Sequence, residues 1–227
     1  LGVCWQPIEP APFPVAAGGD CTVYIPVGHK SGQQLPREDV LAALKPILTS
    51  ADYPKVLQNA KFDRSIFLAQ GIDLAGVVFD PMLASYVLNP EKSHNLTDLG
   101  LRYLGLAAQS YRDLVAKDQT IADVEIGAVA RYCGTDAYST FHLVQPLSQE
   151  LAADPELLQV FRAIELPLEP VLATMEAIGI RIDVAYLAEF SQQLAQDLAE
   201  IEKQAYAAAG EQFNLASPKQ LLSLIHI

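Results

Sequence analysis

The first third of the chain alternates short apolar runs with polar connections. The runs LGVCW and CTVYIPVG are rich in β-branched and aromatic residues, and a Pro- and Gly-rich connection separates them. This pattern predicts an antiparallel hairpin with a long loop. The following segment, PREDVLAALKPILTS, has apolar residues at helical spacing and predicts a helix.

A strand–helix alternation follows the predicted hairpin. KVLQ is typical of a short buried strand, AKFDRSIFLAQG of a helix closed by Gly71, and GVVFD of another buried strand. Asp80 and Pro81 are a good N-cap and first-turn pair for the helix PMLASYVLN. A hairpin followed by this alternation predicts an α/β fold in which helices flank a mixed sheet.

From Asn95 onward the pattern becomes mostly helical. Asp154-Pro155 is a plausible boundary, so we expect one domain over residues 1–153 and a helical segment over residues 154–227. Pro167 and Pro170 are expected to bend the next helix. A long helix then carries a narrow apolar stripe, typical of a two-helix arm, at Leu187, Phe190, Leu194, Leu198 and Ile201.

A last helix is predicted after Ser217-Pro218-Lys219-Gln220. Ser217 is a good N-cap, Pro218 suits the first turn, and Gln220 is placed to complete a capping box.

Composition excludes several classes of function. No apolar run reaches the length of about 18 residues that indicates a membrane span. The three cysteines and four histidines show no metal-ligand spacing, which argues against a zinc site and favours reduced cysteines in a cytoplasmic protein. The net charge of −12 argues against simple electrostatic attraction to nucleic acid, although carboxylates that hold cations would also produce it.

Two places carry candidate chemistry. Asn59 and Asp63 lie where a predicted strand passes into a helix, and Tyr132 and Asp136 lie four residues apart on one face of a predicted helix. Carboxylates that converge at a sheet edge are suitable ligands for Mg²⁺. Each residue also has a plain structural explanation. Taken alone, Asp63 fits a partner of the helix dipole, and the Tyr132/Asp136 pair fits a helix-surface contact.

A resemblance to a known family changes this balance. VLQNAKFDRSIFLAQGIDLAGVVFDPMLASYVLNP resembles the second motif region of the 3′→5′ exonuclease domain of bacterial DNA polymerase I, a family A DNA polymerase. ARYCGTDAYSTFHL resembles its third motif, Tyr-x-x-x-Asp. ELPLEPVLATMEAIGIRID and AGEQFNLASPKQL resemble the passage from the exonuclease domain into the polymerase domain. These segments occur in the same order as in the family.

The resemblance implies a ribonuclease H-like fold and hydrolysis with two metal ions. Asp136 would bind one Mg²⁺ directly, and Asp63 would hold the second largely through water, with Mn²⁺ as a substitute. Tyr132 would position the attacking water. Asn59 would line the site near the terminal nucleotide, and His94, a loop residue by its spacing, is included as a second substrate contact. The expected partners are a single-stranded 3′ end or primer–template DNA and the rest of a monomeric polymerase chain.

One expected motif does not match. The family's first motif, Asp-x-Glu, lies on a strand before the segment that matches LGVCW, and Glu9 is too late to replace it. We therefore expect this chain to be an N-terminally truncated piece with little activity of its own, and the final SLIHI departs from the family.

Two other functions remain open. The acidic motifs also suit a ribonuclease D-like RNA exonuclease, although AGEQFNLASPKQL speaks against that class. A degenerate exonuclease domain kept as a structural module would have lost its motif carboxylates, whereas Asp63 and Asp136 are both present.

Overall fold

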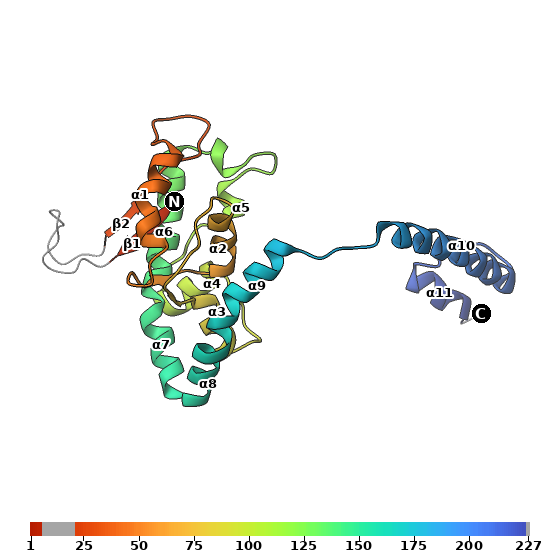
Figure 1. Cartoon of the computed structure of the whole chain (residues 1–227). Helices are drawn as coiled ribbons and strands as arrows, with labels where there is room; N and C mark the ends of the chain where they lie inside the picture. The colour runs from red at the N-terminus through yellow and green to blue at the C-terminus, as the bar shows by residue number, and fades with distance from the viewer. Residues whose placement is uncertain (6–20, 226–227) are drawn as a thin grey trace, which may run out of the picture. The chain divides into compact units, whose positions relative to one another are not determined.

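The computed structural model describes residues 1–5 and 21–225, and the chain divides into two compact units (Figure 1). The first unit is Leu1–Ile178 and the second is Gly179–Ile227. The connection between the two predicted hairpin strands, which includes Glu9, lies outside the described residues. So do the last two residues of SLIHI.

The predicted hairpin is confirmed. Strand β1 (Gly2–Trp5) pairs antiparallel with β2 (Cys21–Tyr24), and Gly2 lies opposite Tyr24. Helix α6 (Ile126–His142) contacts both strands. At Gly2 an added Cβ would lie 2.7 Å from the carbonyl oxygen of Cys133 on α6. Only glycine therefore permits this close approach of strand and helix.

The second strand pair is parallel and is joined by a helix. Strand β3 (Lys55–Val56) leads into α2 (Ala60–Leu68), and β4 (Val77–Phe79) pairs parallel with β3. These elements were predicted, and the helix-rich α/β class with antiparallel and parallel pairs is confirmed. The pairs are not joined into one mixed sheet among the described strands, because they form two separate two-stranded sheets.

Further helices complete the first unit (Figure 1). Asp80 precedes α3 (Pro81–Leu88), as predicted. The others before Asp154 are α1 (Arg37–Leu48), α4 (Leu96–Leu99), a π-helix (Gly100–Leu104), α5 (Tyr111–Leu114), a 3-10 turn (Ile121–Asp123) and α7 (Val144–Ala153).

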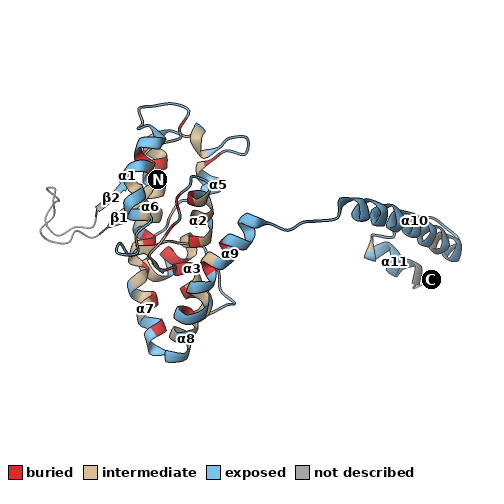
Figure 2. Ribbon diagram, in the orientation of Figure 1, coloured by how far each residue is buried: buried red, intermediate tan, exposed pale blue. Residues whose placement is uncertain are grey.

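Two apolar clusters form the core. The larger joins β4, α3 and α7, and Phe79 lies against Phe161 with ring centroids 5.1 Å apart. The smaller surrounds Phe67 of α2, together with Ile72 and Leu74. The larger cluster holds the end of β4, and the smaller holds the last turn of α2, because close-packed interiors leave little room for an element to shift. Figure 2 shows this buried interior in red.

Three helical segments follow Asp154 and belong to the same compact unit. They are α8 (Pro155–Val160), a π-helix (Phe161–Glu165) and α9 (Leu166–Ile178); α8 contacts α3, and α9 contacts α2. The π-helix ends just before Pro167, whose ring leaves no room for a regular bond to the carbonyl four residues earlier. The bend expected at Pro167 and Pro170 stays a prediction. A domain boundary at residue 154 stays a prediction.

The second unit consists of α10 (Val184–Ala209) and α11 (Pro218–Ile225), both predicted. No residue of α10 is buried, and its apolar stripe is exposed (Figure 2). The capping box is only half formed. Ser217 Oγ accepts from the Gln220 N–H at 3.4 Å, whereas Gln220 Oε1 accepts from the N–H of Asn214 at 2.8 Å. The side chain of Gln220 thus closes the preceding turn instead. None of the described helices is long and apolar enough to span a membrane.

Candidate active site

Asn59 marks the point where β3 passes into α2. Its backbone is left-handed, with φ 59° and ψ 55°, a conformation that asparagine tolerates better than most residues. Its side chain makes no capping hydrogen bond to α2. The side-chain amide of Asn59 therefore takes no part in capping α2.

The carboxylate of Asp80 caps two helices at once. Oδ1 accepts from the N–H groups of Met82 (2.8 Å) and Leu83 (3.4 Å) at the start of α3. The same carboxylate accepts from the N–H of Asn59 (3.1 Å) and of Ala60 (2.8 Å) at the start of α2. Asp80 is 1% exposed, and burial raises its pKa against the lowering effect of these four bonds. The cap predicted from sequence is present, and its second helix was not foreseen.

Asp63 lies in the first turn of α2 and is half-buried. Its pKa is raised to about 6, chiefly by burial and then by the negative charge of Asp80. A carboxylate that serves as a partner of the helix dipole is stabilised in its charged form, which lowers the pKa. The pKa of Asp63 is raised instead. Its surroundings therefore do not stabilise the negative charge of the ionised carboxylate.

Tyr132 and Asp136 face each other on α6. The Tyr132 hydroxyl donates a hydrogen bond to the Asp136 carboxylate, and both side chains are half-buried. Burial raises the pKa of Asp136, while the bond from Tyr132 acts in the opposite direction. Burial and the charge of Asp136 together raise the pKa of Tyr132 well above its ordinary value. The phenol therefore stays protonated and can donate or accept.

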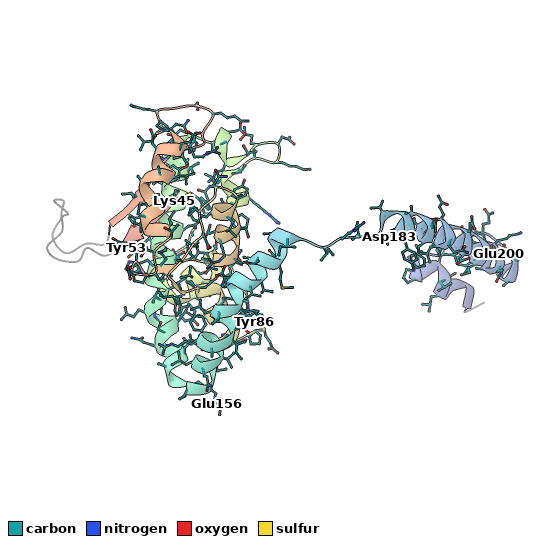
Figure 3. All side chains as sticks on the ribbon, in the orientation of Figure 1. Lys45, Tyr53, Tyr86, Glu156, Asp183 and Glu200 are labelled. Atoms are coloured by element: carbon teal, nitrogen blue, oxygen red, sulfur yellow. The ribbon has the colours of Figure 1, made fainter. Side chains whose placement is uncertain are left out.

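His94 forms hydrogen bonds both to α3 and to the turn before Asn59. Its Nδ1 lies 2.9 Å from the hydroxyl oxygen of Ser85, and its carbonyl oxygen accepts from Gln58 Nε2 at 2.9 Å. The ring lies edge-on to that of Tyr86, which Figure 3 labels, with centroids 5.2 Å apart. His94 thus has a visible structural use, and its role as a substrate contact stays a prediction.

The predicted site residues come in two sets, and the donor types suit a hard cation. Asn59 precedes α2, and Asp63 lies in its first turn. Tyr132 and Asp136 lie on α6. Asp63 and Asp136 offer carboxylate oxygens whose charge the surroundings leave uncompensated, which fits Mg²⁺. Across the described ranges, no three His, Cys, Asp or Glu side chains gather as a metal site. The role of Asp63 and Asp136 as metal ligands therefore stays a prediction.

The sequence pattern did not predict two sets of polar contacts, of which only the first is buried. Arg64 of α2 is buried and forms an ion pair with Glu169 of α9. The ammonium group of Lys55 donates to the carbonyl oxygens of Ile47 (2.8 Å), in the last turn of α1, and of Ser50 (2.9 Å) and Tyr53 (2.5 Å), in the turn that follows. A signal existed for Arg64, since it shares an otherwise apolar helix face with Ala60 and Phe67.

Comparison with known proteins shows a match to a family. The family described as 3′-5′ exonuclease matches residues 15–152, which is more than half of the chain and includes both sets of candidate residues.

Several curated relatives are polymerases. DNA polymerase I of Synechocystis sp. is 55% identical over 204 residues, which are 89% of this chain and 21% of that protein. DNA polymerase I of Pseudomonas aeruginosa is 39% identical over 212 residues, 89% of this chain and 23% of that protein. The corresponding enzyme of Chloroflexus aurantiacus is 37% identical over 212 residues, 91% of this chain and 22% of that protein. The chain spans about a fifth of the length of these relatives.

A solved structure is also similar. It is the POL domain of Pol1 from M. smegmatis in complex with DNA primer-template and dNTP, with a TM-score of 0.69 and 31% identity. The match covers 84% of this chain and 30% of that one.

Proposed function

The chain belongs to the 3′-5′ exonuclease family, and from this premise we propose that it forms the proofreading site of a DNA polymerase I. In this role it removes the 3′-terminal nucleotide of DNA by hydrolysing the last phosphodiester bond. The observation that carries the proposal is the pair of Tyr132 and Asp136 within the matched residues, where a protonated phenol touches a partly desolvated carboxylate.

The carboxylates are proposed as metal ligands. Asp136 would hold one Mg²⁺ directly, and Asp63 would hold a second largely through water, since Mg²⁺ keeps much of its hydration shell. When bound, two such ions activate a water molecule and stabilise the departing 3′-oxygen. The remaining carboxylates are proposed to come from the family's first motif, Asp-x-Glu, on a strand of the complete polymerase chain. A strand bearing that motif could pair with β1 or β3, each of which has one partner among the described strands.

The other side chains are proposed to orient the reactants. The Tyr132 hydroxyl, whose proton is held by Asp136, is proposed to position the attacking water by accepting a hydrogen bond from it. The side-chain amide of Asn59 makes no helix-capping hydrogen bond, and this amide would contact the terminal nucleotide. His94 would support that contact from the adjoining loop through Gln58.

The partners follow from the same premise. We propose that these residues act within a longer, monomeric polymerase chain in the cytoplasm, where a frayed primer end leaves the template and enters the site. The second unit would begin the polymerase portion of that chain. Mn²⁺ would replace Mg²⁺, because both accept carboxylate and water ligands.

Trimming of a labelled oligonucleotide tests the proposal. The complete polymerase chain should shorten single-stranded DNA from its 3′ end in Mg²⁺, and Asp136→Ala should abolish this while primer extension continues. Residues 1–227 alone should trim poorly, because the proposed site also needs the carboxylates of the first motif. Trimming of RNA in preference to DNA would indicate a ribonuclease D-like activity. Trimming unaffected by Asp136→Ala would contradict the proposed site.

A further inference from the structure

A buried arginine connects the helix of Asp63 to α9. Arg64 and Glu169 are 8% and 4% exposed. Arg64 Nε donates to Glu169 Oε1 and Arg64 Nη2 donates to Glu169 Oε2, both at 2.8 Å. The third nitrogen, Nη1, donates to the carbonyl oxygen of Leu74, in the connection between α2 and β4. One guanidinium group therefore joins α2, the connection that follows it, and the sequence-distant helix α9.

This contact is directional. A bidentate bond between guanidinium and carboxylate holds both planes in one orientation, which an apolar contact does not do. A buried ion pair also adds little stability compared with a well-packed apolar pair of similar volume, because both charges must leave water. The ion pair between Arg64 and Glu169 is therefore expected to contribute more to the orientation of the two helices than to the stability of the fold.

The geometry that it fixes includes Asp63. Arg64 follows Asp63 directly on α2, so any rotation of the helix about its axis moves both side chains. A rotation of about 10° displaces a carboxylate about 5 Å from the axis by roughly 1 Å. Displacements of that size at a catalytic group can slow a reaction by about 10²-fold.

We propose that Arg64 and Glu169 are positioning residues that set the rotation of α2, and with it the place of the Asp63 carboxylate. This inference rests on the proposed exonuclease function. It adds that the site depends on α9, which lies outside the residues matched by the exonuclease family. The pair acts together with the double cap of Asp80, which holds the first turn of the same helix.

The test separates position from stability. In the complete polymerase chain, Arg64→Met alone leaves the Glu169 charge buried without its partner and should destabilise the fold. The double variant Arg64→Met/Glu169→Leu removes both charges and should regain most of the lost urea midpoint. Its single-turnover trimming should nevertheless stay at least about tenfold slower than that of the parent, with DNA affinity unchanged. Arg64→Lys, which keeps the charge but loses the fork, should show the same slow step in a folded chain.

The exposed ion pair between the same two helices provides a matched control. Lys61 Nζ lies 2.5 Å from Glu176 Oε1, and both side chains reach solvent, so Lys61→Met/Glu176→Leu should change neither stability nor trimming appreciably. Trimming at the parent rate by either Arg64→Lys or the double variant would overturn the positioning role.

Hydrogen exchange separates this idea from the proposed function. In residues 1–227, the backbone amides of α2 should exchange about tenfold faster in Arg64→Met/Glu169→Leu than in the Lys61/Glu176 control. Equal exchange would overturn the positioning role even in a chain that trims DNA. A parent polymerase that does not trim DNA would instead refute the proposed function, while the exchange rates still report whether the pair fixes α2.

Discussion

Replacing Asp63 with asparagine should make the metal-free protein more stable at neutral pH. Asparagine has nearly the shape of a protonated aspartate, so the packing of α2 is kept and only the charge is lost. The ionised carboxylate is the unfavourable form here, because burial and the charge of Asp80 both oppose it. A residue selected for stability would not be expected to behave in this way.

The magnitude follows from the pKa. A rise from 3.8 to about 6 corresponds to about 3 kcal/mol at most, at 1.36 kcal/mol for each pH unit. Asp63 is only half-buried, so solvent reduces this figure, and we expect a gain on the order of 1–3 kcal/mol at pH 7.

The pH dependence has a definite sign. Between about pH 4 and pH 6 the folded protein binds a proton at Asp63 that the unfolded chain has released, so the parent loses stability as the pH rises through this window. The variant lacks this titration. The difference in unfolding free energy should therefore be near zero below pH 4 and reach its full value above pH 6.

Urea denaturation of residues 1–227 measures this difference in unfolding free energy. Circular dichroism monitors the unfolding, in EDTA and at several pH values. Asp73→Asn, at an exposed carboxylate, controls for the change in net charge. A loss of several kcal/mol at pH 7, or a difference that does not vary between pH 4 and pH 7, would refute the reasoning. Asp63 would then be a structural residue.

Three further results are expected. Asp80→Ala leaves four backbone N–H groups without their acceptor, so the free energy of unfolding should fall by about 3 kcal/mol or more in urea titrations. Tyr132→Phe removes one hydroxyl, so single-turnover trimming by the complete chain should slow by roughly 10²-fold with DNA binding unchanged. Lys55→Met removes the donor to three carbonyl oxygens and should destabilise the chain by about 1–2 kcal/mol, whereas an unchanged urea midpoint would show that water replaces it.

Local pattern was sufficient to predict the elements that lead to the site. The apolar run before Asn59, the helical spacing after it and the Asp80-Pro81 pair each depend on neighbours in sequence, and the structure confirms the elements they predict. The acidic residues themselves were found because motifs of the family occur in the right order. Spacing alone could not separate Asp63 from an ordinary first-turn aspartate.

The missed contacts of Asp80 and Arg64 depend on segments far apart in the chain. Asp80 reaches back 20 and 21 residues to the N–H groups of Ala60 and Asn59, and Arg64 reaches forward 105 residues to Glu169. Neither separation leaves a periodic signal, because helical and strand patterns report only local geometry. The division of the predicted mixed sheet into two pairs was missed for the same reason, since strand order is a long-range property.

Crystals of the complete polymerase chain, soaked in Mn²⁺ with a short single-stranded oligonucleotide, test the central claim most directly. Asp63→Asn would be used to slow hydrolysis during the soak. Anomalous scattering locates the metal independently of any assumption about the ligands. We expect a strong Mn²⁺ peak within direct bonding distance of Asp136, with Tyr132 beside it and the 3′-terminal phosphate against the metal. In the unsubstituted chain a second peak should lie roughly 4 Å away, on the side of Asp63. Mn²⁺ and the 3′ end bound away from Asp136, in a chain that still trims DNA, would contradict the central claim.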